Sequence, residues 1–432
     1  MIWNRKAECM DKAELKALQL KRLQNVVELV YHTVPFYKKR LDSVGMTPDK
    51  LKTLKDFEEI PYTTKDDIRD NYPFGLFARP MKEIVRVHAS SGTTGKPTVV
   101  GYTREDLDMW SEAMARLISM AGGNDDDIAQ IAFGYGLFTG AFGLHYGLEK
   151  VGATVVPTSS GNTEKQIMLM KDFGTTLLIA TPSYALYIAE VMEDMGIKKE
   201  ELKLQRAMLG AEGSTEEMRQ ALEEKLGIVA TENYGLSEVL GPGVAGECVE
   251  KCGMHINEDL FYTEIIDSKS GDVLNWSDTG EVVLTPLLKN GFPLLRYRTK
   301  DISYVTDEPC KCGRTSARLA KIQGRSDDML IIKGVNVFPS QIESVLVGMD
   351  HIGPHYQITV SKKGYVDELE VAVELTDGSI LESYSELEKL KKQVKHKIHT
   401  VLGLDVKLKL VEPKTLERFV GKAKRVIDLR NQ

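Results

Sequence analysis

The stretch Ser90-Ser91-Gly92-Thr93-Thr94-Gly95-Lys96-Pro97 decides the fold, because it is a loop of the phosphate-binding kind between two short apolar runs. Glycines let backbone N–H groups approach an anion closely, while the hydroxyls and the lysine supply further donors. Such a loop can hold the β- and γ-phosphates of ATP. It is not a Walker A loop, since Ser90 stands in place of the first glycine and Pro97 replaces the Ser or Thr that binds magnesium. A flexible hairpin rich in small residues is the alternative interpretation.

The residues around this loop predict alternating strands and helices. Residues 84–87 and 98–102 are predicted strands on either side of the loop, and residues 104–121 form a predicted helix. Upstream, apolar residues share one helical face over residues 11–32, and Pro35 ends that helix. Downstream, short apolar strands recur at residues 128–133, 154–156, 177–180 and 207–209. This alternation favours an α/β fold built of several layers.

The C-terminal part of the chain follows a different pattern. Apolar and polar side chains alternate over residues 356–360, 369–375 and 404–410, and a charged helix is expected over residues 384–401. Half-buried strands with one or two helices indicate a small α+β domain. A chain of 432 residues is also longer than one core usually serves. We therefore expect a large N-terminal domain over residues 1–326 and a small C-terminal domain over residues 327–432.

The composition excludes several classes of protein. The net charge of −7 argues against general nucleic-acid binding, which needs a basic surface. The sequence has no apolar run of the roughly 18 residues that span a membrane, and its first residues carry charges where a signal peptide needs an apolar stretch. Five cysteines in a chain this long do not form a disulfide scaffold. We expect a cytoplasmic protein that binds neither nucleic acid nor membrane.

Four further motifs follow the loop along the chain. They are Tyr234-Gly235-Leu236-Ser237-Glu238, Tyr297-Arg298-Thr299-Lys300-Asp301, Gly324-Arg325-Ser326-Asp327-Asp328 and Gly421-Lys422-Ala423-Lys424-Arg425. In this order the motifs resemble the adenylate-forming superfamily of acyl-CoA synthetases, luciferases and nonribosomal adenylation domains. Residues 63–77, 134–140 and 324–331 are similar to stretches of the phenylacetate–CoA ligase family and narrow the resemblance to it. The match extends from about residue 15 to the C-terminus.

The resemblance assigns a nucleotide site. The loop with Lys96 would hold the β- and γ-phosphates, and Glu238 would hold Mg²⁺, a hard cation that prefers carboxylate oxygens. A surface glutamate without a ligand is the alternative for Glu238. Asp301 would accept hydrogen bonds from both ribose hydroxyls. Tyr234 would stack on adenine, and the remaining nucleotide contacts would come from Gly210, Ala211 and Glu212 along the edge of the base, with Gly235 and Ser237.

The resemblance also implies that the C-terminal domain moves between two reaction steps. Lys422 would reach the α-phosphate and carboxylate oxygens, where negative charge builds during adenylation. A solvated basic turn with Lys424 and Arg425 is the alternative. Arg325 would contact the ribose or the α-phosphate, or else form a salt bridge at the domain boundary. Asp327 would be the hinge about which the domain rotates.

The acid pocket is expected around Tyr135, Gly136 and Phe138. Aromatic and glycine neighbours can form a flat slot for a ring. No Lys or Arg falls in this stretch, so a neutral ring fits better than a second carboxylate. The resemblance implies an aryl-acetic acid, with phenylacetate first and its hydroxylated forms or indoleacetate as alternatives. Ordinary core aromatics are the other interpretation of these residues.

The cysteines and one histidine predict a separate metal site. Cys248, Cys252 and His255 lie close in sequence, and Cys310 and Cys312 follow as a tight pair. Tetrahedral zinc needs four ligands. The resemblance favours Cys248, His255, Cys310 and Cys312, with Cys252 as the alternative ligand. Such a zinc ion would be structural, because four protein ligands leave no position for substrate. Free thiols are the alternative to a metal site.

The resemblance implies a two-step ligase that uses ATP, Mg²⁺ and coenzyme A. The acid would attack ATP to give an acyl-adenylate and pyrophosphate, and the coenzyme A thiol would then displace AMP. No side-chain nucleophile is needed, since catalysis is positioning and charge stabilisation. Transfer to a carrier protein or another acceptor is one alternative. A catalytically inactive nucleotide-binding interaction protein is another, against which Lys96, Glu238, Asp301 and Lys422 together argue. A homodimer is expected from the family.

Overall fold

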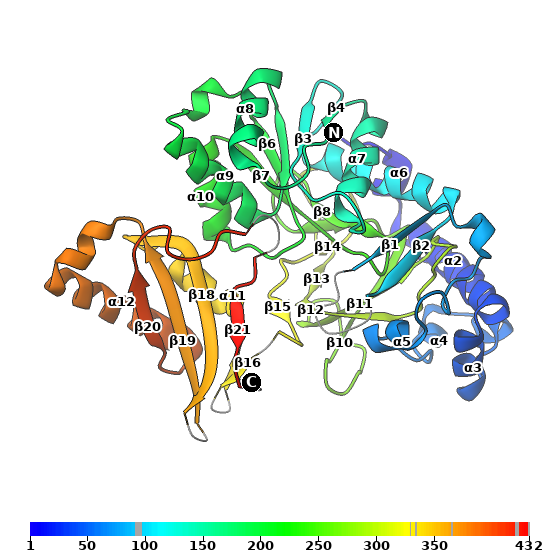
Figure 1. Cartoon of the computed structure of the whole chain (residues 1–432). Helices are drawn as coiled ribbons and strands as arrows, with labels where there is room; N and C mark the ends of the chain where they lie inside the picture. The colour runs from blue at the N-terminus through cyan, green and yellow to red at the C-terminus, as the bar shows by residue number, and fades with distance from the viewer. Residues whose placement is uncertain (91–96, 329, 333–334, 364–365, 420–422, 431–432) are drawn as a thin grey trace. The chain divides into compact units, whose positions relative to one another are not determined.

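A computed structural model describes residues 1–90, 97–328, 330–332, 335–363, 366–419 and 423–430 (Figure 1). The chain forms two compact units. The first unit contains Met1–Ala180, Leu202–Ala211 and Thr231–Lys321. The second unit contains Thr181–Glu201, Glu212–Ala230 and Ile322–Gln432. Two segments from the middle of the chain therefore belong to the same compact unit as the C-terminal residues, which no feature of the sequence had indicated.

Short helices form the N-terminal part of the first unit. They are α1 (Arg5–Glu8), α2 (Lys12–Thr33), α3 (Pro35–Ser43), the 3₁₀ helix η1 (Pro48–Lys50), α4 (Leu54–Phe57) and α5 (Lys65–Asp70). The predicted helix over residues 11–32 is confirmed as α2. Pro35 ends it, as expected, and also begins α3, where its fixed φ suits the first helical position. Thr64 and Asp67 form a capping box that starts α5 directly at Lys65.

The predicted strands on either side of the phosphate loop form an antiparallel hairpin. After the 3₁₀ helix η2 (Met81–Glu83), β1 (Arg86–Ala89) pairs with β2 (Val99–Tyr102). The first strand starts and ends two residues later than predicted. Thr103 and Asp106 then form a capping box that starts α6 (Arg104–Met120). The hairpin thus presents the ends of the predicted phosphate loop at Ala89 and Val99.

A nine-stranded mixed sheet forms the centre of the first unit, in the order β13-β14-β9-β8-β7-β6-β5-β3-β4. Its parallel part consists of β3 (Ile128–Ile131), β4 (Thr154–Val156), β5 (Leu177–Ala180) and β6 (Arg206–Leu209). The other members are β7 (Val229–Leu236), β8 (Gly241–Glu247), β9 (Met254–Ile256), β13 (Val305–Thr306) and β14 (Arg318–Leu319). All four predicted strands are confirmed, together with the α/β class, and they pair in parallel.

Two more helices and a second sheet complete the first unit. The helices are α7 (Gly140–Val151) and α8 (Thr163–Phe173), and α7 packs against α6. In the second sheet β10 (Phe261–Ile266), β11 (Gly280–Pro286) and β12 (Tyr297–Ser303) are antiparallel neighbours. Within the described ranges, no helix is long and apolar enough to cross a membrane.

The second unit confirms the predicted α+β pattern. Its sheet has the order β20-β19-β18-β21, formed by β18 (Ile352–Lys363), β19 (Val366–Leu375), β20 (Lys407–Val411) and β21 (Val426–Asp428). The helices α11 (Pro339–Leu346) and α12 (Tyr384–Leu402) share an apolar core with these strands (Figure 1). The remaining elements are α9 (Pro182–Asp194), η3 (Lys199–Glu201), α10 (Glu216–Leu226), β15 (Gly324–Arg325), β16 (Leu330–Ile332), β17 (Val335–Val337) and η4 (Gly378–Glu382).

Candidate active site

Glu238 lies in the turn between β7 and β8, where the two strands approach closely. A Cβ atom on Gly235 would overlap the carbonyl oxygen of Gly241, so only glycine fits there. The Glu238 side chain is buried, with 5% of its surface exposed. Its Oε1 atom lies 3.4 Å from Lys65 Nζ of α5. A buried carboxylate that already attracts a cation has the charge and the oxygen ligand that Mg²⁺ requires.

A second lysine lies near the same carboxylate. Lys289 is fully buried and its Nζ donates to the main-chain oxygen of Glu238 at 3.3 Å. The ammonium group also faces the rings of Tyr102 and Phe292, at 4.6 and 5.1 Å from their centroids. Burial lowers the pKa of Lys289 to about 7, although Asp106 and Glu238 act in the opposite direction. The lowered pKa means that Lys289 loses its charge more readily than an ordinary lysine, which reduces its repulsion of a cation at Glu238.

The resemblance places Tyr234 at the adenine and Asp301 at the ribose. In the structure the two side chains contact each other. The Tyr234 hydroxyl on β7 donates to Asp301 Oδ2 on β12 at 2.6 Å. Asp301 is 8% exposed, and its own amide donates to Thr299 Oγ1 at 3.0 Å. The contact holds the carboxylate in one orientation, ready for further donors.

The Gly210-Ala211-Glu212 segment follows β6 and has a constrained backbone. A Cβ atom on Gly210 would meet Asn233 at 2.9 to 3.1 Å. Ala211 has a φ of +69°, the left-handed conformation that costs energy for a residue with a side chain. The carboxylate of Glu212 accepts from the amide of Ser183 at 2.7 Å and from the amide of Ala423 at 2.9 Å. Glu212 therefore ties three segments of the second unit together.

Tyr135 belongs to an aromatic group in the first unit. Its ring meets Phe142 edge to face at 5.3 Å, and its hydroxyl lies 3.1 Å from His145 Nδ1. Burial raises the pKa of Tyr135. Thr139 Oγ1 lies 2.8 Å from Ser237 Oγ, so the predicted acid-pocket stretch and the Glu238 motif are neighbours. Gly136 has a φ of +131°, whereas Phe138 is half exposed.

Cys248, His255, Cys310 and Cys312 converge in the first unit, and we refer to these four residues as the cysteine cluster. Their ligand atoms all lie within 4.8 Å of one another. Cys248 Sγ is 3.7 Å from Cys310 Sγ, and Cys312 Sγ is 3.3 Å from His255 Nε2. Ligand atoms about 2.0 to 2.3 Å from a central zinc ion in tetrahedral geometry would be separated by about 3.3 to 3.8 Å. These two separations match the spacing of zinc ligands.

The imidazole of His255 is oriented by a second group. Its Nδ1 atom lies 3.2 Å from the main-chain oxygen of Ser316 and 3.1 Å from Ser316 Oγ. Such a partner fixes the tautomer that leaves Nε2 as a ligand. Burial lowers the pKa of His255 to about 4, so the ring is neutral at physiological pH. Cys252, the alternative ligand, lies 3.5 Å from Cys310 Sγ and accepts from Arg318 Nη1 at 2.8 Å.

The models of two families match the sequence. The AMP-binding enzyme model matches residues 18–285, and the AMP-binding enzyme C-terminal domain model matches residues 334–430. A phenylacetate-coenzyme A ligase of Aromatoleum evansii is 49% identical over 98% of this chain and 97% of its own length. Enzymes of the same name from Thermus thermophilus and Escherichia coli are 46% and 45% identical, over 100% of this chain and over 100% and 99% of their own lengths.

The chain belongs to the phenylacetate–coenzyme A ligase family of AMP-binding enzymes.

A solved 2-hydroxyisobutyryl-CoA ligase extends this comparison. In its postadenylation state it matches with a TM-score of 0.94 at 29% identity, over 100% of this chain and 93% of that chain. In its thioesterification state the TM-score is 0.74 at 30% identity, with the same coverage. The predicted family and adenylate-forming fold are therefore confirmed.

Several predicted residues of this ligase-family chain lie outside the described residues. They are Ser91, Gly92, Thr93, Thr94, Gly95 and Lys96 of the phosphate loop, and Lys422. At the edge of the loop, the Ser90 amide donates to the Thr98 oxygen at 3.0 Å and Ser90 Oγ accepts from the Thr98 amide at 3.3 Å. These contacts close the base of the loop and support its predicted position between the two strands.

Arg325 and the predicted hinge residue Asp327 form an ion pair with each other. Arg325 Nε lies 2.9 Å from Asp327 Oδ1, and Nη2 lies 3.0 Å from Oδ2. The salt bridge that the sequence left as the alternative for Arg325 is thus present.

Sequence reasoning missed three charged residues that adjoin the predicted site. Lys65 and Lys289 both contact Glu238, as described above. Arg86 on β1 lies over the rings of Phe142 and Tyr146, at 5.2 and 4.8 Å, and donates to the Tyr146 hydroxyl at 3.1 Å. The stretch around Tyr135 contains no basic residue, yet a neighbouring strand places one beside its aromatic group. Lys65 lies within residues 63–77, and the resemblance of that stretch to the family was the signal that could have identified it.

Proposed function

We propose that this chain joins phenylacetate to coenzyme A with ATP, through phenylacetyl-AMP, and releases AMP and pyrophosphate. One observation carries the proposal: four curated phenylacetate-coenzyme A ligases are 45 to 49% identical to the chain over nearly its whole length. The matches span 98 to 100% of the chain, so the segments that carry the predicted motifs lie within them.

The nucleotide would be held by residues from four segments. Tyr234 would stack on adenine beside Gly210 and Ala211, and Asp301 would bind the ribose hydroxyls while the Tyr234 hydroxyl orients it. The phosphate loop with Lys96 would hold the β- and γ-phosphates. Glu238 would hold Mg²⁺, which neutralises the charge of the phosphates when bound. Lys65 would leave Glu238 and face the phosphates, since a mobile ammonium group prefers the larger negative charge.

The acid would enter beside Tyr135 and Phe142, with Gly136 and Phe138 at its mouth. Aromatic rings that meet edge to face can accept another flat ring. The carboxylate must then reach the α-phosphorus of ATP. The methylene group of an aryl-acetate sets the distance between the ring and the carboxylate. Displacement of reacting atoms by about 1 Å can cost about a hundredfold in rate, so chain length is a selective feature.

We infer that residues 327–432 form the mobile domain and that Asp327 is the hinge. The C-terminal family model covers residues 334–430, and the main model covers residues 18–285, which include α9 and α10. One ligase has different TM-scores in two named states, which supports two arrangements of such chains. Lys422 would act in the adenylation arrangement only.

The cysteine cluster would hold structural zinc. The ligand set matches the soft thiolate and imidazole donors that zinc prefers, and Cys252 is left as a neighbour. Four protein ligands would close the coordination sphere, so the metal would contribute to folding. We also propose a cytoplasmic location, as the composition led us to expect, and a homodimer, as the resemblance implies.

A panel of acids tests the proposal. The kcat/KM for thioester formation should be highest for phenylacetate, compared with benzoate, acetate and hexadecanoate, at saturating ATP, Mg²⁺ and coenzyme A. Benzoate lacks the methylene, acetate lacks the ring, and hexadecanoate is far longer than the slot. A higher kcat/KM for acetate or hexadecanoate than for phenylacetate would overturn the aryl-acetate assignment. Activity with a carrier-protein thiol and none with coenzyme A would show that coenzyme A is not the acceptor.

A further inference from the structure

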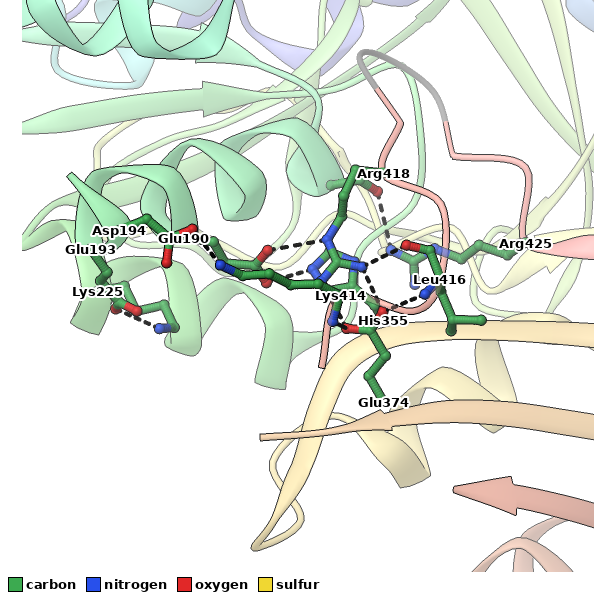
Figure 2. A network of polar contacts seen from close by, with 11 residues as sticks. Glu190, Glu193, Asp194, Lys225, His355, Glu374, Lys414, Leu416, Arg418 and Arg425 are labelled. Carbon is green, nitrogen blue, oxygen red and sulfur yellow. Dashed lines mark hydrogen bonds and ion pairs between the residues drawn. The ribbon is translucent and has the colours of Figure 1, made fainter. Parts of the chain in front are cut away.

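The chain before Lys422 is folded back by a two-sided contact of Arg418 (Figure 2). On one side, Arg418 Nη1 and Nη2 donate to the two carboxylate oxygens of Glu374 on β19, at 2.8 and 2.7 Å. The same carboxylate accepts from the amides of Lys414 and Leu416, at 3.1 and 2.7 Å. Glu374 is 2% exposed, so this anchor is a buried one within residues 374–418. On the other side, Arg418 Nε donates to Glu190 Oε2 of α9 at 3.2 Å.

The chain after Lys422 has a matching arrangement around Arg425. Arg425 Nη1 forms an ion pair with Glu343 Oε1 of α11 at 2.9 Å, and its guanidinium lies over the Tyr356 ring at 4.6 Å. The Tyr356 hydroxyl donates to Glu343 Oε2 at 2.9 Å. On its other side, Arg425 Nη2 donates to Ser183 Oγ of α9 at 3.1 Å. Each arginine therefore has one partner from the C-terminal family domain and one from α9.

The α9 helix offers a line of acceptors to this part of the chain. Glu190 accepts from His355 Nε2 at 2.5 Å as well as from Arg418, and Asp194 Oδ2 accepts from Lys414 Nζ at 2.6 Å. Glu193 on the same helix pairs instead with Lys225 of α10, at 2.7 Å (Figure 2). Glu190 and Asp194 therefore make this contact, whereas Glu193 on the same helix pairs with Lys225 instead.

The contacts with α9 are polar and only partly buried. The side chains of Arg418 and Glu190 are 15% and 21% exposed, and those of Lys414 and Asp194 are 67% and 54% exposed. A hollow of about 20 Å³, enough for a water molecule, lies among the same residues and is lined by Ser183, Tyr187, His355, Leu416 and Phe419. Partly solvated ion pairs around a hollow bind weakly, so this contact can open.

Separation of this contact would leave no buried charge without a partner on either arginine. If α9 and residues 414–425 separate, Arg418 keeps Glu374 and Arg425 keeps Glu343, so neither guanidinium loses its buried partner. An unpaired buried charge would cost several kcal/mol, about 3 to 5 by general experience, and this arrangement avoids that cost. The chain on both sides of Lys422 can therefore stay folded while it docks and undocks.

We propose that Glu190 is a positioning residue that docks the Lys422 segment, through Arg418 and His355, for the adenylation step alone. The inference rests on the proposed two-step function. Glu190 touches neither nucleotide nor acid in this account. It acts by raising the fraction of molecules in which Lys422 is held for adenylation, and its contact opens for the thioester step.

Separate assays of the two half-reactions test the role of Glu190. Glu190→Gln should slow phenylacetate-dependent ATP–pyrophosphate exchange about tenfold, the factor that one charge-assisted hydrogen bond supplies. Thioester formation from supplied phenylacetyl-AMP and coenzyme A should stay unchanged or rise. Glu193→Gln, the matched control on the same helix, should change neither rate. Equal losses in both half-reactions, or no loss in either, would overturn the proposal.

A charge swap adds a test that folding defects cannot imitate. Asp194→Lys should slow the exchange reaction about threefold, because it repels Lys414 across an exposed pair worth under about 1 kcal/mol. The double variant Asp194→Lys with Lys414→Asp should restore the rate. Failure of the swap to restore it, with both proteins folded, would count against docking through this face.

Amide hydrogen exchange tests docking without any substrate. In Glu190→Gln, a peptide containing the Ala423 amide, which donates to Glu212 Oε2 at 2.9 Å, should exchange several times faster than in the unmodified protein, and in Glu193→Gln it should not. Unchanged amide hydrogen exchange in Glu190→Gln would overturn the docking role, even if phenylacetate is the wrong acid. Failure of the proposed function instead shows in the unmodified protein, as an absence of exchange between ATP and pyrophosphate with phenylacetate.

Discussion

The carboxylates of the proposed nucleotide site, Glu238 and Asp301, and the cysteine cluster are both polar groups in the first unit, but their partners differ in kind. In the cysteine cluster each ligand atom faces other ligand atoms within 4.8 Å, and Ser316 fixes the orientation of His255. In the nucleotide site Glu238 faces Lys65 at 3.4 Å, and Asp301 accepts from the Tyr234 hydroxyl. The four donors of the cluster converge on one point, as the ligands of a closed metal site would. The carboxylates have partners that a ligand can replace or join.

This difference teaches how to separate a site for stability from a site for chemistry. Four donors that converge on one point leave no position for substrate, so a metal there would act on folding. A buried carboxylate with one long ion pair keeps oxygen lone pairs for an incoming cation. Loss of a group should therefore affect rate in one place and stability in the other.

Substitution of Glu238 should have the largest effect on rate. Glu238→Gln keeps the size of the side chain but removes the charge, so adenylation should fall about a hundredfold or more. The thermal midpoint should change little, because Lys65 is exposed enough to be solvated. Glu232→Gln, on β7 before the turn that carries Glu238 and paired with Lys321, is the matched control and should keep a normal rate. Near-normal exchange in Glu238→Gln at ordinary magnesium would remove Glu238 from the site.

Substitution of the cluster should act on stability instead. The double variant Cys310→Ser with Cys312→Ser should lose its zinc and about 3 kcal/mol or more of unfolding free energy. Where the variant stays folded, its rate should remain close to normal. Elemental analysis should find about one zinc ion per chain in the unmodified protein. A metal-free protein with unchanged stability would return these residues to free thiols.

Loss of the Tyr234 hydroxyl should have a smaller effect, and on binding. Tyr234→Phe keeps the ring for stacking on adenine but removes the donor that orients Asp301. The KM for ATP should rise about two- to tenfold with kcat nearly unchanged, as expected for loss of one hydrogen bond that orients Asp301. An unchanged KM would mean that Asp301 is held by other groups. A fall in kcat alone would place Tyr234 in the chemical step.

Substitution of Cys252 should have the smallest effect and would sharpen the ligand assignment. Cys252 is exposed and lies outside the four converging ligands. Cys252→Ser should keep its zinc and change the unfolding free energy by about 0.5 kcal/mol or less. Loss of zinc in this variant would show that Cys252 replaces one of the four proposed ligands.

Local patterns predicted the elements of the fold closely. The strands over residues 154–156 and 177–180 have the predicted bounds, because short apolar runs between helices have few other solutions in an α/β fold. The capping boxes at Thr64 and Thr103 are readable in the same way. The sequence pattern did not predict α3, which begins at Pro35, because proline was interpreted only as the end of α2.

Contacts between distant segments were beyond such patterns. Motif resemblance brought Tyr234 and Asp301 to one site, but nothing local to Lys65 or Lys289 indicates that both approach Glu238. The same limit applies to Glu190 and Arg418, whose pairing depends on how α9 packs in the second unit. Sequence periodicity reports which face of an element is buried, and not which charged residue of another element it meets.

ATP–pyrophosphate exchange without coenzyme A tests the central claim most directly. If Glu238, Asp301 and their neighbours bind ATP for adenylation, the purified protein should return labelled pyrophosphate to ATP only when phenylacetate and Mg²⁺ are present. Glu238→Gln should abolish most of this exchange, while the double cysteine variant should retain it. Thioester formation with ADP and phosphate as products, and no exchange with phenylacetate, would contradict the account.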